Sequence, residues 1–233
     1  MLKCSLDNIQ SLFAAIAKEA KLYLPVDNAD GSASFSEWSE GVEWSGALNT
    51  TKSPKDFFFP QTEDLMRFKT EGKSIEVIDV RRESEDFVVF GVRACDVKSF
   101  DILDRVFLTE PRDSFYAMKR EKGIIVSLAC TRPAETCFCS AFGINAAEPA
   151  GDVSAWKTED ALYLQANTEK GVKLLESLAD ILEDTTDAEV AAQKEKIAKI
   201  MSKLPLKDLS TDAFGGGKTQ ELFNDPMWDE LSS

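Results

Sequence analysis

Histidine is absent from this chain of 233 residues. Its absence excludes nucleophile pairs and triads that use imidazole, zinc proteases with two helical histidines, and haem held by histidine. Any acid–base chemistry would have to come from carboxylates, lysine, tyrosine or cysteine. The five cysteines are therefore the candidate ligands for a soft metal.

Basic residues are also scarce. The chain has 27 Lys plus Arg against 41 Asp plus Glu, a formal net charge of −14 and a pI of about 4.6. Nucleic acids and anionic membrane surfaces are bound by clustered Lys and Arg, so neither is expected as a partner.

Long apolar runs are missing as well. No run approaches the ~20 residues of a membrane span, and MLKCSLDNIQ lacks the apolar core of a signal peptide. With 43% hydrophobic and 29% charged residues, the composition is that of a globular protein. We expect a soluble, cytoplasmic protein whose cysteines are reduced.

The middle of the chain predicts a parallel sheet. Residues 74–80, 86–92 and 124–129 read as strands, and the last two runs are separated by helical patterns after Cys95 and over 113–122. Strand, helix and strand in this order are typical of a βαβ unit. The segment 52–63, with its Phe57–Phe59 triplet between prolines, is expected to be extended and mostly core.

Flanking segments complete the expected architecture. A helix with Asp7 as N-cap precedes irregular loops at 27–55, and a hairpin at 152–167 precedes helices at about 169–182, with Val172 on its apolar face, and 187–204. We predict an α/β fold with a mixed, partly parallel sheet flanked by helices, irregular N-terminal loops and a helical C-terminal part. The expected domains are 1–210, with a core of about 52–182, and a linker with a short helix at 211–233.

Four cysteines fall near the ends of predicted strands. Cys95 ends one strand, Cys130 ends another, and Cys137 and Cys139 lie in the loop that follows. Parallel strands place their carboxyl ends at one edge, where ligands bind, so the topology can bring four thiols together. Such a set suits a [4Fe-4S] cluster or structural zinc, although strand-end cysteines are also common as small buried groups.

Charged residues next to these cysteines could contribute to the same site. Arg93 and Arg132 flank the site and could offset the charge of a cluster. Asp96 is better interpreted as the N-cap of the helix after Cys95 than as an oxygen ligand to iron.

Two other features are not expected to form a site. Cys4 is isolated, and FGGGKT at 214–219 lacks the first glycine of a phosphate-binding loop.

Several segments, taken in order, resemble a known family. They are SPKDFFFPQTEDLMRF, FGVRACDVKSFDILDRVFL, DSFY, IIVSLACTRPAETCFCSAFG and TEKGVKLLESL. Together they are similar to the N-terminal domain of iron-sulfur electron-transfer subunits, which include that of anaerobic sulfite reductase and the beta subunits of hydrogenase and sulfhydrogenase complexes. The resemblance covers the chain from about residue 45 to its end.

This resemblance carries expectations about cofactors and partners. It implies one [4Fe-4S] cluster on Cys95, Cys130, Cys137 and Cys139. Two further clusters belong to a ferredoxin-like module that would follow a segment such as LFNDPMWDELSS. Because the chain stops at Ser233, we expect a fragment of a longer subunit, although a naturally split gene would look the same.

The resemblance also implies a role without catalysis by this chain alone. As a component of an NAD(P)H-linked oxidoreductase, it would dock a flavin-containing NAD(P)H-binding subunit and a catalytic reductase or hydrogenase subunit, and relay electrons between them. A cofactor-free docking module and a structural zinc domain held by four cysteines remain alternatives.

Overall fold

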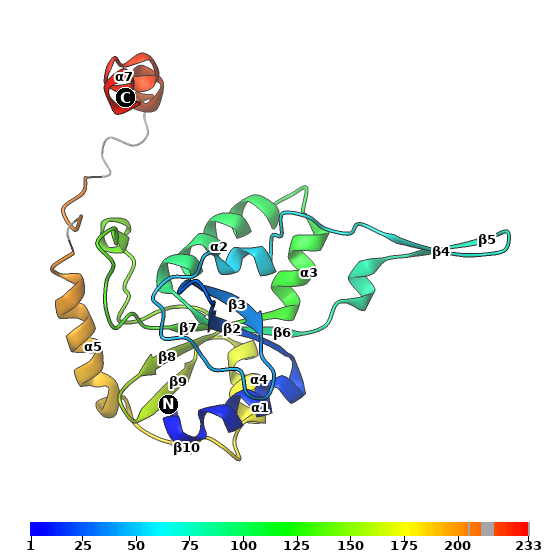
Figure 1. Ribbon diagram of the computed structural model, residues 1–233, viewed down its shortest axis with the longest axis horizontal. Helices are drawn as coiled ribbons and strands as arrows, with labels where there is room; N and C mark the ends of the chain where they lie inside the picture. The colour runs from blue at the N-terminus through cyan, green and yellow to red at the C-terminus, as the bar shows by residue number, and fades with distance from the viewer. Residues whose placement is uncertain (205, 211–216, 233) are drawn as a thin grey trace.

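An eight-stranded mixed sheet forms the centre of the computed structural model, which describes residues 1–204, 206–210 and 217–232 (Figure 1). The strand order is β10-β1-β9-β8-β7-β6-β2-β3. Strands β2, β6, β7 and β8 run parallel to their neighbours in this set, and the outer pairings are antiparallel. The predicted α/β fold with a mixed, partly parallel sheet is therefore confirmed. The strands are β1 Leu2–Ser5, β2 Lys21–Asp27, β3 Ala33–Glu37, β6 Phe87–Val92, β7 Gly123–Leu128, β8 Val153–Lys157, β9 Ala161–Ala166 and β10 Glu183–Asp184.

The parallel centre follows from two unbroken apolar runs. All six residues of β6 are buried, and so are five of the six in β7. Strands that are covered on both faces need such runs, since neither face meets water. Helices α2 (Ala94–Phe107) and α3 (Ser114–Lys122) connect them, as the βαβ pattern predicted. Asp113 starts α3 by accepting hydrogen bonds from the amides of Phe115 and Tyr116.

Alternating side chains divide the core between the two faces. Val126 and Leu128 of β7 pack with α1 (Ile9–Glu19) and α4 (Glu169–Ser177), whereas Ile125 packs on the opposite face with α2 and α3. Helix α5 (Asp187–Met201) covers the antiparallel end of that opposite face through Val190 and Ile197, which pack near Trp156. The sheet is thus covered on both sides, and its carboxyl edge is left for loops.

The strand predicted at 74–80 exists, but outside the main sheet. Strands β4 (Arg67–Glu71) and β5 (Ser74–Ile78) pair only with each other and project from the body (Figure 1). Phe68 lies opposite Val77 and Thr70 opposite Ile75 on one face. Phe68, Ile75 and Val77 are each at least 60% exposed. The hairpin therefore carries an uncovered apolar face, which an alternating pattern alone cannot distinguish from a core strand.

Other local predictions were wrong. The extended segment expected at 52–63 contains a 3-10 helix, Pro54–Phe57, capped by Ser53. Of the phenylalanine triplet, Phe58 is fully buried and Phe59 is 46% exposed, so only part of it is core.

Helix boundaries also differ from the predictions. A 3-10 helix, Leu6–Asn8, precedes α1, so Asn8 rather than Asp7 is the residue before that helix. Helix α4 ends at Ser177, and Val172 on it is exposed instead of facing the core. The two N-terminal strands β1 and β2 were not predicted.

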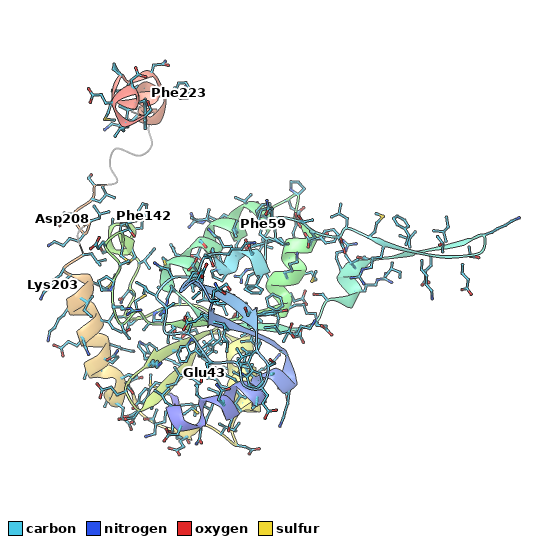
Figure 2. All side chains as sticks on the ribbon, viewed as in Figure 1. Glu43, Phe59, Phe142, Lys203, Asp208 and Phe223 are labelled. Carbon is cyan, nitrogen blue, oxygen red and sulfur yellow. The ribbon has the colours of Figure 1, made fainter. Side chains whose placement is uncertain are left out.

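The C-terminal part forms short helices. They are α6 (Lys218–Glu221), a 3-10 turn (Leu222–Asn224) and α7 (Met227–Leu231). Figure 2 shows Phe223 on this segment, where it is 74% exposed. Residues 211–216, which include the first half of FGGGKT and the start of the predicted linker, lie outside the described residues. No helix in the described ranges has the length and apolar character to cross a membrane.

Gly171 is expected to be intolerant of substitution, because α4 packs directly on the loop before β8. A Cβ at this position would lie 2.1 Å from the carbonyl oxygen of Asp152. Backbone must move to relieve that contact, so Gly171→Ala should destabilise the fold by roughly 1–3 kcal/mol. Gly46→Ala is the control, since a Cβ there meets nothing within 4 Å. Equal midpoints of urea unfolding for the two variants would contradict this packing.

Candidate metal centre at the carboxyl edge of the sheet

A bulge at the end of β6 sets the start of the site. Gly91 has φ = 86°, a conformation that favours glycine, and the register with β7 shifts between Phe90 and Val92. The position of a Cβ on Gly91 would lie 3.2 Å from Cδ of Pro25, so β2 also approaches closely. The chain leaves this bulge directly into Arg93 and helix α2. The bulge therefore aims the first turn of α2 at the edge of the sheet.

Cys95 and Asp96 both lie inside that first turn, which corrects two predictions. Cys95 does not end the strand, because α2 begins at Ala94 with Arg93 as its N-cap. Asp96 is therefore not the N-cap. Its Oδ1 accepts a hydrogen bond of 2.7 Å from the Ser53 hydroxyl. Burial raises the pKa of Asp96, although the bond from Ser53 opposes that rise.

The other three cysteines follow β7 in one loop. The Cys130 amide donates to the carbonyl of Ala146 at 3.3 Å, which joins the two ends of this loop. Cys137 Sγ accepts a hydrogen bond of 3.2 Å from the Ala134 amide. Cys139 begins a 3-10 helix, Cys139–Phe142, which Gly143 terminates in the left-handed conformation. The loop therefore folds Cys137 and Cys139 back into a compact turn.

The four thiols influence one another electrostatically. The charges of Cys130 and Cys139 act on Cys95, and those of Cys139 and Cys137 act on Cys130. Burial raises the pKa of Cys95 to about 11, with Asp96 and Cys130 adding to the rise, and burial likewise raises the pKa of Cys130 and Cys139. All four are free thiols, and Cys95 keeps an exposed surface. Without a bound cation, Cys95, Cys130 and Cys139 are therefore neutral at pH 7.

The four thiols do not form a ready-made metal site in the described structure. In the part of the chain that the structure describes, no group of three or more cysteine, aspartate or glutamate side chains is arranged to hold a metal ion. The assignment of Cys95, Cys130, Cys137 and Cys139 as ligands, and of Asp96 as an alternative ligand, remains a prediction. Cys4 is separate, as expected, and is buried in the main core.

Arg93 brings a buried positive charge to this edge. Its Nε and Nη2 donate to the carbonyls of Leu48 and Ala47 at 3.1 and 2.9 Å. Burial lowers the pKa of Arg93, whereas Cys130 and Cys95 are the first groups that oppose this. No carboxylate among the described residues forms an ion pair with it. The thiols are thus the groups best placed to neutralise Arg93 if they ionise. Arg132, the other predicted flanking arginine, donates to the Gly46 carbonyl at 3.3 Å.

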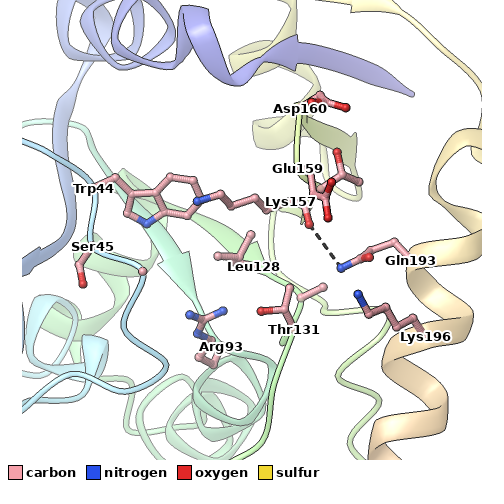
Figure 3. A pocket seen from close by; sticks show the side chains of 13 residues that line it. Trp44, Ser45, Arg93, Leu128, Thr131, Lys157, Glu159, Asp160, Gln193 and Lys196 are labelled. Atoms are coloured by element: carbon pink, nitrogen blue, oxygen red, sulfur yellow. Dashed lines mark hydrogen bonds between the residues drawn. The ribbon is translucent and has the colours of Figure 1, made fainter.

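Two cavities meet at Arg93, and the sequence did not indicate either. One, of about 270 Å³, is lined by Arg93, Cys95 and Asp96 among others. The second, of about 540 Å³, opens between the carboxyl ends of β7 and β8, the segment around Trp44 and helix α5 (Figure 3). Lys157 ends β8 at the same edge as the cysteines. Its place at the end of a strand was the sequence feature that could have indicated this cavity.

The fold and this edge define an α/β domain whose sheet edge carries several thiols beside positively charged side chains. The chain is similar to Sulfhydrogenase 2 subunit beta of Pyrococcus furiosus, with 29% identity over 183 residues. The match covers 78% of this chain and 53% of that protein, so the chain spans about half the length of the curated relative it matches. This similarity supports a relationship with hydrogenase-type beta subunits. No protein-family model matches the chain, and no solved structure matches it.

Arg93 should hold the segment 45–50 against the sheet edge. Arg93→Gln removes the fork that binds the carbonyls of Ala47 and Leu48, so this segment should become more accessible. We expect faster hydrogen exchange and faster proteolysis within residues 45–50. Arg132→Gln is the matched control, because its one bond to Gly46 is longer and exposed. Equal protection of the segment in both variants would show that Arg93 does not hold it.

Proposed function

We propose that this chain is an electron-transfer and docking domain of a hydrogenase-type oxidoreductase complex. The observation that carries the proposal is that Cys95 and Cys130 both act on the buried charge of Arg93, while Cys137 and Cys139 act in turn on Cys130. The similarity to a protein named as a sulfhydrogenase beta subunit supports the same conclusion. We expect the chain to act in the cytoplasm and to catalyse no reaction alone.

The donor set fits a [4Fe-4S] cluster. Four thiols without imidazole are the usual ligands of such clusters. Four cysteines can also hold a structural zinc ion, so metal analysis must separate the two. The Ser140 hydroxyl, next to Cys139, is buried and has no hydrogen-bond partner among the described residues, so it could donate to a sulfur of the cluster.

When bound, the cluster would supply one-electron storage at a potential set by its surroundings. The residues of the chain would position and neutralise it. Cys95 comes from the first turn of α2 and Cys130 from the residues just after β7, whereas Cys137 and Cys139 lie further along the loop and would close the site. Arg93 would offset the negative charge of the thiolates. A relay of this kind needs no acid, base or nucleophile in the domain.

Partner subunits follow from the same proposal. Electrons would pass between a flavin-containing NAD(P)H-binding subunit and a catalytic hydrogenase or sulfite reductase subunit. Two further [4Fe-4S] clusters would belong to a ferredoxin-like module that continues this chain in the complete subunit. The family suggested by the sequence, in which anaerobic sulfite reductase also has a member, supports this arrangement.

The β4–β5 hairpin is the surface that we propose for docking one such subunit. A two-stranded hairpin is only marginally stable alone in water, so its apolar face needs a cover. Residues 67–78 contain three basic and two acidic residues, in a chain whose net charge is −14. The occupant should therefore be a partner subunit of the hydrogenase-type complex, with an apolar patch inside an acidic rim.

Substitution of the proposed ligands should remove iron. Cys95→Ser and Cys139→Ser should each abolish the brown colour and the absorption near ~400 nm after anaerobic reconstitution with iron and sulfide, because serine does not replace thiolate in the cluster. Cys4→Ser is the matched control, since Cys4 is buried in the separate main core. It should keep full iron content.

Metal analysis separates the alternatives. Iron with acid-labile sulfide supports the cluster, and zinc without visible absorption supports the four-cysteine zinc domain instead. Wild-type protein that binds neither metal anaerobically would leave the cofactor-free docking module and would refute the electron-transfer role.

Polar substitutions on the apolar face of the β4–β5 hairpin should weaken binding of a partner subunit without changing the stability of the domain. Phe68→Ser combined with Val77→Ser should leave the unfolding midpoint of the body unchanged, because neither side chain contacts the main core. Purification from the native host should then lose the hydrogenase-type or flavin-containing subunit, identified by mass spectrometry. Lys69→Gln with Glu76→Gln, a cross-strand pair on the other face, is the control. Retention of that subunit by the serine variant would contradict docking through this face.

A further inference from the structure

The larger cavity at the sheet edge carries an inference independent of any metal. Its volume is about 540 Å³, within the range of roughly 300–1,000 Å³ that is usual for small-molecule sites. Its walls come from four parts of the fold: the segment after Trp44, the end of β7, the β8–β9 turn and helix α5 (Figure 3). A concave site built from several elements at the carboxyl ends of parallel strands is a typical place for a ligand.

Positive charge gathers in this cavity although the chain is acidic overall. Arg93, Lys157 and Lys196 line it, and none of them forms an ion pair with a described carboxylate. Lys157 Nζ lies 4.5 Å from the centroid of the Trp44 ring. Glu159 and Asp160 also line the cavity but are exposed, and Figure 3 shows Asp160 on the side opposite Arg93. The end near Arg93 is therefore suited to an anion.

Hydrogen-bond donors remain available at that end. Arg93 uses Nε and Nη2 for backbone carbonyls, and its Nη1 has no partner in the part of the chain that the structure describes. Among the described residues, no hydrogen bond occupies the Thr131 hydroxyl or Lys196 Nζ, and Figure 3 shows Thr131 between Arg93 and Lys196. A guanidinium, a hydroxyl and an ammonium group together match the oxygens of a tetrahedral oxyanion.

We propose that this cavity binds a tetrahedral oxyanion through Arg93, Thr131 and Lys196. The oxyanion is either free, as phosphate or sulfate, or the phosphate group of a nucleotide-sized cofactor. The cavity is larger than one oxyanion needs, and Trp44, Leu128 and Ala129 offer apolar surface for an attached ring. A ring stacked on Trp44 would take the place of Lys157, which would then be free to contact the anion.

The ligand would lie next to the thiol site without depending on it. Ala129 and Thr131 line the cavity on both sides of Cys130 in the sequence, and Arg93 lines both cavities. The charge of Arg93 would then serve two anionic neighbours. Binding of the oxyanion requires no cluster, so it can be measured separately from the proposed electron-transfer function.

Calorimetric titration of the full chain, prepared anaerobically, tests the proposal. The probes are inorganic phosphate, sulfate and FMN, each titrated at low and high NaCl. We expect saturable binding with one site per chain, weakened by salt because the contacts are ionic. Lys196→Gln and Thr131→Val should each weaken binding about tenfold, as loss of one hydrogen bond to a charged group does. Lys203→Gln is the control, because Lys203 is exposed just beyond α5 and does not line the cavity.

Each outcome decides one question. Binding of FMN in competition with phosphate supports a nucleotide phosphate at the site, and binding of phosphate or sulfate alone supports a free oxyanion. No saturable binding of any probe, or equal affinity in Lys196→Gln and Lys203→Gln, overturns the proposal. The same titration on Cys139→Ser separates it from the proposed function, since oxyanion binding should persist there when iron is lost.

Discussion

The charge of Arg93 is the constraint around which the carboxyl edge of the sheet is built. A guanidinium removed from water is costly unless an anion or several hydrogen bonds compensate it. The carbonyls of Ala47 and Leu48 satisfy two of its donors but leave the charge in place. The nearby acid Asp96 interacts with this charge, although burial raises its own pKa. Thiolates of a bound cluster on one side and a bound anion on the other would add to this compensation, so both proposed ligands answer the same electrostatic need.

Much of the fold was predictable where one signal dominated. Strands β6 and β7 are unbroken apolar runs, and Asp113 marks the start of α3, so the βαβ centre followed from the sequence. Strand β2 was missed because Pro25 interrupts it, and proline normally argues against an inner strand. The structure accommodates this proline because β2 pairs with β6 only over Lys21–Tyr23, so Pro25 lies beyond the parallel ladder.

The site was predictable only in part, for a related reason. Cys130 and the loop cysteines follow a strand, so topology predicted their edge. Cys95 was assigned to the end of a strand because spacing cannot reveal that the Gly91 bulge sends the chain straight into a helix. The large cavity draws on residues as distant as Trp44 and Lys196, and no local pattern connects them. Its chemistry depends on long-range packing, which a single sequence does not display.

The placement of β1 has a consequence for the order of folding during synthesis. This strand lies between β9 and β10, with Leu2 opposite Leu164 on one side and Asp184 on the other. Both neighbours are made more than 150 residues after it. Pairing over such separations is slow because a long loop must close before any contact forms. The parallel centre can therefore assemble while the chain is still growing, whereas the antiparallel half, with Cys4 in its core, must wait until translation has passed β10.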